Sequence, residues 1–153
     1  MINNNKYITM KKSIGVLVIS VLSIACTQKN DYKSVRDEVM KFHDVVMADH
    51  GKIINNQMAL DTLLKDLKGL KLKSPEVDTL KERVEINALL SKLTAAEDSM
   101  NDWMHKFEPD VTGKSNDEAI QYFEAEKAKI ATIDSLYKVE IKVSGEYLSK
   151  FKK

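Results

Sequence analysis

A chain of 153 residues with 24 basic and 23 acidic side chains carries a formal net charge of +1, and it holds one cysteine. This length suits one domain with one core, the single cysteine excludes an internal disulfide, and the balanced charge argues against nucleic acid as a partner. With only five glycines and two prolines among many lysines, glutamates, leucines and alanines, the composition favours long helices.

The first predicted element is an export signal over residues 1–25. Three lysines precede an apolar run that extends from Ile14 to Ala25. This run of 12 residues is shorter than the ~20 apolar residues of a membrane-spanning helix, and it matches the ~7–15 apolar residues of a signal peptide. We therefore expect residues 1–25 to be a signal peptide that is removed on export.

The only cysteine follows this apolar run directly. The segment LSIAC, which ends at Cys26, resembles a bacterial lipobox, although its leucine stands one place earlier than usual. The resemblance implies a diacylglyceryl group on the thiol of Cys26, cleavage before this residue and acylation of the new amine. Two or more acyl chains give a stable membrane anchor where one would be marginal. An uncleaved anchor and an ordinary signal peptide with a chance cysteine are the alternatives.

Residues 26–31 are expected to be the lipidated cysteine and a short polar tether. Without the three leader lysines, the mature chain keeps 21 basic and 23 acidic residues, a net charge of −2. Thr27 follows the cysteine in place of the aspartate that often retains lipoproteins in an inner membrane, and no acidic run comes after it. These features favour the cell envelope, at an outer membrane facing the periplasm, with the lipid on Cys26 as the membrane contact.

Residues 32–153 are predicted to form an all-α, elongated, antiparallel three-helix bundle with coiled-coil-like packing. The first helix is predicted at about 32–71, because ten of twelve positions spaced alternately three and four apart are apolar. We call such a set of positions the seam of a helix. Asp49 and Asn56 interrupt this seam, which indicates a hydrated gap, a register-fixing polar contact or a ligand pocket at mid-bundle. The seam continues across Gly51, so we expect a continuous or gently kinked helix there.

The second helix is predicted at about 75–108. Ser74 is expected to cap it, and Pro75 suits the first helical position. Its apolar stripe begins with residues that include Leu80 and Val84, and it continues in a shifted phase beyond them. A short first loop between two long helices favours antiparallel packing.

The third helix is predicted at about 116–151, after a loop rich in turn-forming residues. Ser115 and Glu118 have the spacing of a capping box, in which each side chain accepts a hydrogen bond from the backbone of the other. The sequence therefore places the start of this helix directly after Ser115.

Methionine and histidine side chains gather at one height of the predicted bundle. An antiparallel turn near residue 73 would bring His43 level with Trp103 of the second helix. Thioether and imidazole groups suit Cu(I) or Ag(I), so a metal site is one hypothesis. The alternative interpretation is that the methionines fill gaps in the core and widen the apolar face. The hypothetical ligands are Met40, His43, Met47, Met100 and Met104.

Catalytic patterns are weak in this sequence. Cys26 is expected to be lipidated, and no serine stands in a strand–turn–helix context. The carboxylates of Glu97, Asp98 and Asp102 are typical of the solvated face of a long helix. We therefore predict a protein that is not an enzyme and needs no cofactor, unless Cu(I) is bound.

Two segments, Phe42 to Met47 (FHDVVM) and Met100 to Phe107 (MNDWMHKF), carry a resemblance to known proteins. They resemble a group of small, uncharacterised helical lipoproteins of Bacteroidota that are often labelled "viral A-type inclusion protein". The resemblance covers most of the mature chain. It implies a lipid-anchored helical protein, and it implies no catalytic or binding residues.

Leader, helices and composition together favour a lipid-anchored envelope protein with a structural or protein-interaction role. Its expected partners are the membrane, through the lipid on Cys26, and other envelope proteins. Two further functions are possible on the same observations. One is a periplasmic Cu(I)- or Ag(I)-binding protein, and the other is a helical periplasmic chaperone or stress sensor.

Overall fold

The structure is a computed structural model that describes residues 31–151. Within this range the chain forms four α-helices and no strand, which confirms the all-α prediction. Their bounds are α1 (Tyr32–Lys65), α2 (Leu67–Lys73), α3 (Thr79–Lys106) and α4 (Asn116–Ser149). None of these helices is both long and apolar enough to cross a membrane. The predicted signal peptide and Cys26 lie outside the described residues.

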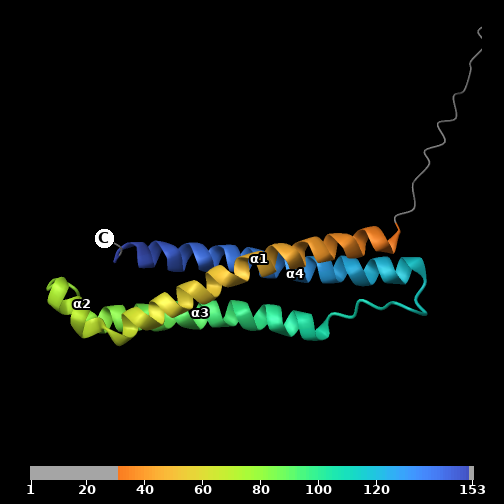
Figure 1. Cartoon of the computed structure of the whole chain (residues 1–153). Helices are drawn as coiled ribbons and strands as arrows, with labels where there is room; N and C mark the ends of the chain where they lie inside the picture. Colours follow the sequence, from red (N-terminus) through yellow and green to blue (C-terminus); the bar gives the residue numbers. More distant parts are fainter. Residues whose placement is uncertain (1–30, 152–153) are drawn as a thin grey trace, which may run out of the picture.

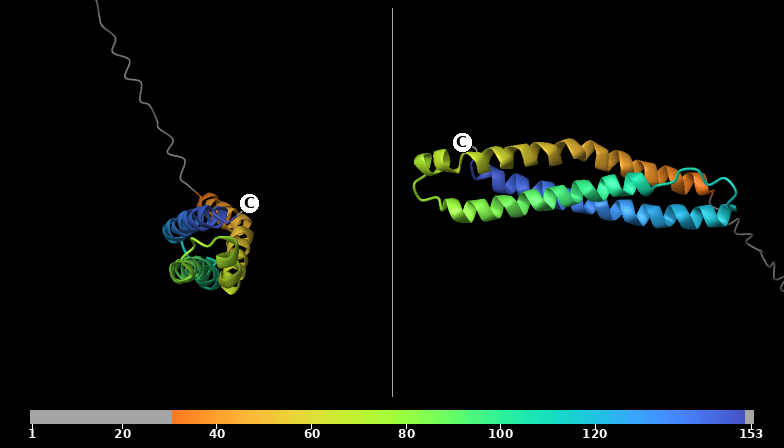
Figure 2. Two further views of the ribbon diagram at one scale, coloured as in Figure 1. Left: turned by 90° about the vertical axis from the view of Figure 1, so that its left-hand side faces the viewer. Right: turned by 90° about the horizontal axis from the view of Figure 1, so that it is seen from below.

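The three long helices lie side by side in a rod (Figure 1). α1 and α4 run in the same direction and α3 runs in the opposite one, so the chain reverses at each loop as expected for an antiparallel bundle. Seen end-on, the three helices surround one central core (Figure 2). α1 has 34 residues, which at 1.5 Å per residue gives a length of about 50 Å.

The core is built from apolar side chains that recur every three or four residues along α3 and mostly every seven residues along α1. This spacing turns one face of each helix toward its two neighbours. The buried apolar residues are Val35, Val39, Val46, Ile53 and Leu60 of α1, Ile86, Leu89, Leu93, Ala96, Met100 and Trp103 of α3, and Ala119, Phe123, Ile130, Ile133, Tyr137, Tyr147 and Leu148 of α4, with Leu67 of α2.

A polar contact fixes the register between α1 and α4. The Nδ2 atom of Asn56 donates to the Oγ atom of Ser144 at 2.8 Å and to the carbonyl oxygen of Ile141 at 3.3 Å. Asn56 is therefore a register-fixing seam residue, one of the three interpretations of the polar seam positions. Asp49, the other such position, accepts a hydrogen bond from Lys52 at 2.7 Å on its own helix.

The first helix ends earlier than residue 71, where the sequence placed its end. The backbone N–H of Asp66 donates to the carbonyl oxygens of Thr62 and Leu63, both at 3.2 Å, which closes α1. The carboxylate of Asp66 accepts the N–H of Gly69 at 3.2 Å and so caps the start of α2. Since the seam continues through the buried Leu67, its periodicity did not reveal this break.

The second helix begins at Thr79, and the predicted start at Pro75 was wrong. Ser74 ends α2 and does not cap the next helix. The cap is Asp78, whose Oδ1 atom accepts the N–H of Leu80 at 3.0 Å. Aspartate is as good a cap as serine, and it stands four residues further along the chain.

The first turn and a half of α3 does not follow the predicted apolar stripe. Leu80 and Val84 are 75% and 71% exposed, so they are not core residues. The face that meets α4 passes instead through Glu82, whose carboxylate accepts a hydrogen bond from the hydroxyl of Tyr147. The buried stripe of α3 starts at Ile86, in the shifted phase.

The start of α4 confirms the predicted capping box. The Oγ atom of Ser115 accepts the N–H of Glu118 at 3.3 Å, and the carboxylate of Glu118 accepts the N–H of Ser115 at 2.8 Å. The hydrogen bonds that the backbone N–H and the hydroxyl of Ser115 donate to this carboxylate lower the pKa of Glu118. Gly113, in the loop before this cap, has a φ of 89°, a conformation that glycine adopts without strain.

Candidate functional site

His43 and Trp103 lie beside each other, as the expected hairpin register required. Their ring centroids are 6.2 Å apart, with the rings tilted by 38°. The Nδ1 atom of His43 also lies 3.0 Å from a carboxylate oxygen of Asp44, its neighbour in the chain. The histidine thus bridges α1 and α3 at the height where the metal hypothesis placed it.

The four methionines of the metal hypothesis fall into two environments. Met100 is 1% exposed and belongs to the core stripe, as the gap-filling interpretation expected. Met40, Met47 and Met104 are 37%, 39% and 37% exposed, so these three residues lie partly open to solvent at the surface of the bundle. Among the described residues, no group of three or more His, Cys, Asp or Glu side chains is placed to hold a metal ion. The thioether site stays a hypothesis.

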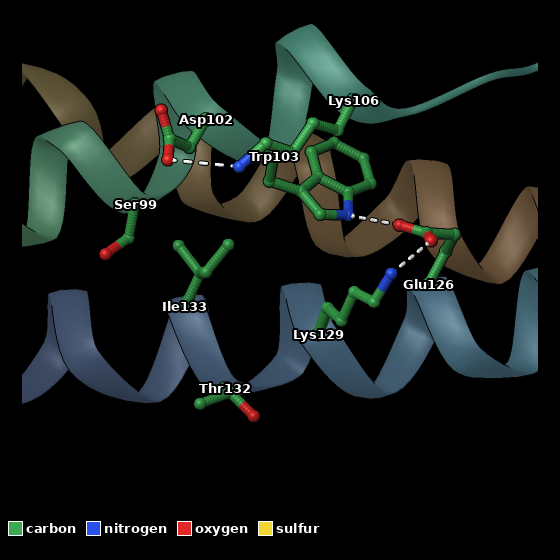
Figure 3. Close-up of a pocket in the computed structure, with 8 residues that line it drawn as sticks. All are labelled: Ser99, Asp102, Trp103, Lys106, Glu126, Lys129, Thr132 and Ile133. Carbon is green, nitrogen blue, oxygen red and sulfur yellow. Dashed lines mark hydrogen bonds and ion pairs between the residues drawn. The ribbon is translucent and has the colours of Figure 1, made fainter.

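A groove of about 480 Å³ opens between α3 and α4 (Figure 3). Buried side chains of both helices lie at its bottom, Trp103 from α3 and Glu126 and Ile133 from α4, and exposed charged side chains of both helices form its rim. The residues that line it are Ser99, Asp102, Trp103, Lys106, Glu126, Lys129, Thr132 and Ile133. We call this space the α3–α4 groove.

A buried carboxylate is the most unusual group in the α3–α4 groove. Glu126 is only 5% exposed. Its Oε2 atom accepts the indole N–H of Trp103 at 2.9 Å, and its Oε1 atom accepts a hydrogen bond from Lys129 at 2.7 Å (Figure 3). Because a buried carboxylate is unfavourable without partners, both donors are needed. The hydrogen bond and charge of Glu126 raise the pKa of Lys129.

Aromatic rings hold Trp103 in place from behind. Its indole stacks on Phe107 at 4.7 Å between centroids, and Phe107 lies 6.5 Å from Tyr122 and 6.2 Å from Phe123. The hydroxyl of Tyr122 accepts the N–H of Glu108 at 2.7 Å, which ties the end of α3 to α4. The position of the indole is therefore determined by packing between two helices and the loop that joins them.

The rim of the α3–α4 groove carries two ion pairs. Lys129 lies on Glu126, and Lys106 lies 3.3 Å from a carboxylate oxygen of Asp102. Both members of the Lys106–Asp102 pair are exposed, so this pair can open at little cost. Lys129 is 62% exposed but pairs with a buried carboxylate, so another donor has to take its place when it leaves. The groove thus offers two cations and two anions beside an apolar floor.

The sequence interpretation missed Glu126 and Lys129. A signal was present, because Glu126 stands between Phe123 and Ile130 at the three- and four-residue spacing of the seam. A carboxylate at a seam position needs a buried partner, and Trp103 on the facing helix is a long side chain with one donor. The predicted seam of the third helix included only apolar residues, so Glu126 was left out of it.

A second polar group lies near the middle of the bundle. The hydroxyl of the fully buried Tyr137 lies 3.3 Å from the Nδ1 atom of His50. Burial raises the pKa of Tyr137 to about 12, and the negative charge of Glu97 adds to this shift. Glu97 itself accepts a hydrogen bond from Gln57 at 3.2 Å. These contacts join all three long helices.

Comparison of the chain with known protein families, with curated proteins and with solved structures found no match. The resemblance of two segments to helical lipoproteins therefore stays a prediction. The functional argument depends on the leader sequence, on the shape of the bundle and on the side chains described above.

Proposed function

We propose that the chain is a lipid-anchored protein of the cell envelope that acts through contacts with other proteins and not by catalysis. The lipid on Cys26 would hold the protein to a membrane, on our expectation the outer membrane on its periplasmic side. This proposal depends on the leader, in which a signal-peptide apolar run ends at the only cysteine.

The direction of the bundle supports this proposal. α1 begins at one end of the rod, and its cap Asp31 follows Cys26 by five residues (Figure 1). Five residues span at most roughly 17 Å, so the start of α1 would stay near the bilayer. The opposite end, which holds α2, would then project by up to about 50 Å, the length of the rod.

Exposed apolar side chains at this far end suit a contact with a partner protein. Leu72 of α2 is 84% exposed, and Leu80 and Val84 lie exposed on the first turns of α3. Exposed apolar groups that gather on one part of a protein often mark an interaction site. A rod that holds such groups away from its anchor is suited to reach a partner across a gap.

The anchor is tested by the Cys26→Ser variant. We expect the unchanged chain to incorporate labelled palmitate and to fractionate with membranes. The variant lacks the thiol that carries the lipid, so it should take up no label and appear in the soluble fraction. Thr27→Ser is the matched control, since it alters the neighbouring residue and keeps the thiol. Membrane retention of the Cys26→Ser variant would contradict the proposal.

A Cu(I)- or Ag(I)-binding role is the second candidate. The observation that favours it is the position of His43 beside α3, on a bundle whose Met40, Met47 and Met104 residues lie partly open to solvent. Titration of the full chain with Cu(I) under reducing conditions tests it. Sub-micromolar binding that is lost when Met40 and Met47 are both changed to leucine supports this role, and absence of such binding rejects it. Leucine keeps the volume and removes the sulfur.

A further inference from the structure

We propose that the α3–α4 groove binds a small zwitterion with an apolar side chain, such as a free apolar amino acid. In this arrangement the ligand's ammonium group replaces Lys129 on the carboxylate of Glu126, and the released Lys129 binds the ligand's carboxylate. The proposal does not depend on the lipid anchor. It depends on the contacts of Glu126, the exposure of Lys129 and the shape of the groove.

Glu126 is prepared to receive an ammonium group. Its Oε2 atom is held by the buried indole N–H of Trp103, so the carboxylate keeps its position when its other partner leaves. That other partner, Lys129, reaches Oε1 from a side chain that is 62% exposed. The carboxylate of Glu126 is buried, so it needs a second donor whenever Lys129 leaves, and the incoming ammonium group supplies that donor.

The charges around the groove favour a zwitterion over a simple cation or anion. Asp102, Lys106, Glu126 and Lys129 sum to no net charge. A ligand that brought only an ammonium group would leave Lys129 without a partner, and one that brought only a carboxylate would gain no place on Glu126. A ligand with both groups keeps every charge at this site compensated.

The centre of the groove suits an apolar side chain. Trp103 and Ile133 form its buried floor, and Ile133 points from α4 toward α3 (Figure 3). The hydroxyls of Ser99 and Thr132 already donate to carbonyl oxygens of their own helices, at 2.7 Å and 3.0 Å. The volume of about 480 Å³ lies within the ~300–1,000 Å³ of small-molecule sites.

The position of Trp103 gives a direct assay. It is the only tryptophan of the chain, so the tryptophan emission of the purified, detergent-extracted protein reports on this groove alone. We would titrate this protein with leucine, with isoamylamine and with isocaproate, which share a branched apolar chain. Leucine should give a saturable change in emission, with a dissociation constant on the order of 1 mM or lower. Isoamylamine should bind more weakly, and isocaproate should bind least.

Two variants test the assigned roles. Glu126→Gln keeps the acceptor for the indole and removes the charge, so leucine binding should weaken about tenfold or more. Lys129→Gln changes an exposed side chain and should reduce leucine binding to the level of isoamylamine. The matched control is Glu124→Gln, because Glu124 pairs with Lys127 at 2.8 Å with the same three-residue spacing, outside the groove. Circular dichroism would establish that each variant keeps its helices.

Three results would overturn the proposal. The first is the absence of any saturable change in Trp103 emission with leucine. The second is binding of isocaproate or isoamylamine as tight as that of leucine, since the zwitterion would then have no advantage. The third is unchanged leucine affinity in both Glu126→Gln and Lys129→Gln. None of these results bears on membrane attachment, which the Cys26→Ser variant tests separately.

Discussion

Tyr137 lies fully buried where the three long helices meet, with its hydroxyl against His50. Burial raises its pKa to about 12, and the charge of Glu97 adds to the shift. An unfolded chain releases the same proton at a pH of about 10. The contribution of Tyr137 to the free energy of unfolding is therefore complete below pH ~10. This contribution is lost as the pH rises from there toward 12, because the hydroxyl ionises first in the unfolded state.

We predict that the free energy of unfolding, measured by urea denaturation, falls across this alkaline window. The fall should be smaller in a Tyr137→Phe variant, which has no hydroxyl to ionise. Part of the fall should remain, because burial and the hydrogen bond to Glu82 also raise the pKa of Tyr147. Equal losses in the variant and the unchanged chain would show that Tyr137 ionises normally in the folded state.

At the residue scale, sequence reasoning succeeded where local spacing determines the outcome. The His43–Trp103 contact followed from counting residues on either side of a turn. Glu126 was missed because its role depends on the side chain that faces it across the bundle, and spacing on one helix does not report this. Likewise, the exposure of Leu80 and Val84 was decided by the direction in which α3 meets α4.

At the scale of the element, α1 carries a glycine that serves no purpose visible in its surroundings. A Cβ atom added at Gly51 would meet nothing within 4 Å. Gly51→Ala should therefore stabilise the folded chain by up to about 1 kcal/mol in thermal or urea unfolding, because glycine in a helix is less favourable than alanine by this amount. If Gly51→Ala instead lowers the stability of the chain, Gly51 must make a contact outside the bundle described here.

Gly69 of α2, unlike Gly51, has no free space for a side chain. A Cβ atom at this position would fall 2.3 Å from the Oδ1 atom of Asp66. Gly69→Ala should displace the carboxylate that caps α2, so the lost cap offsets the gain in helix propensity. We expect this variant to be less stable than Gly51→Ala in the same assay.

The capping box at the start of α4 gives a further prediction for an element. Ser115→Ala removes the side chain that accepts the N–H of Glu118, and it should lower the free energy of unfolding by about 1 kcal/mol. Ser91→Ala is the matched control, since Ser91 is exposed in the middle of α3. There the same change should be neutral or slightly stabilising, because alanine is the better helix former.

The end of a helix could be predicted correctly only where its capping residues form a short, recognisable pattern in the sequence. Ser115 and Glu118 form one within four residues, and the start of α4 was correct. At the first turn Ser74 is followed by Pro75 and suits a cap, but the structure uses Asp78, which no such local pattern marks. The break at Asp66 could not be read from a seam that continues beyond it.

At the scale of the whole molecule, Phe123 joins three segments of the chain. Its ring lies 6.2 Å from Tyr32 of α1 and 6.2 Å from Phe107 at the end of α3. Phe123→Ala should lower the free energy of unfolding by roughly 3–5 kcal/mol, as for other buried aromatic residues. The control is Val84→Ala, which removes a side chain that is largely exposed and should change stability by less than about 0.5 kcal/mol.

The arrangement of the three rods was predictable because short loops leave little freedom. Long apolar seams and two turns dictate an up-and-down path. The sequence did not reveal that α1 would lie mainly along α4, since periodicity identifies the buried face of a helix and not the neighbour that covers it. That choice depends on contacts such as those of Asn56 with Ser144 and of Lys127 with Glu38, at 2.8 Å and 2.9 Å.

The parallel pairing of α1 with α4 has a consequence for biogenesis. Residues that are hydrogen-bonded across this interface are separated by 84 to 89 positions in the chain. A polypeptide that is synthesised from its amino end therefore displays the apolar stripe of α1 well before the matching helix has emerged. Until α4 arrives, part of this stripe stays uncovered, and an uncovered apolar stripe favours aggregation.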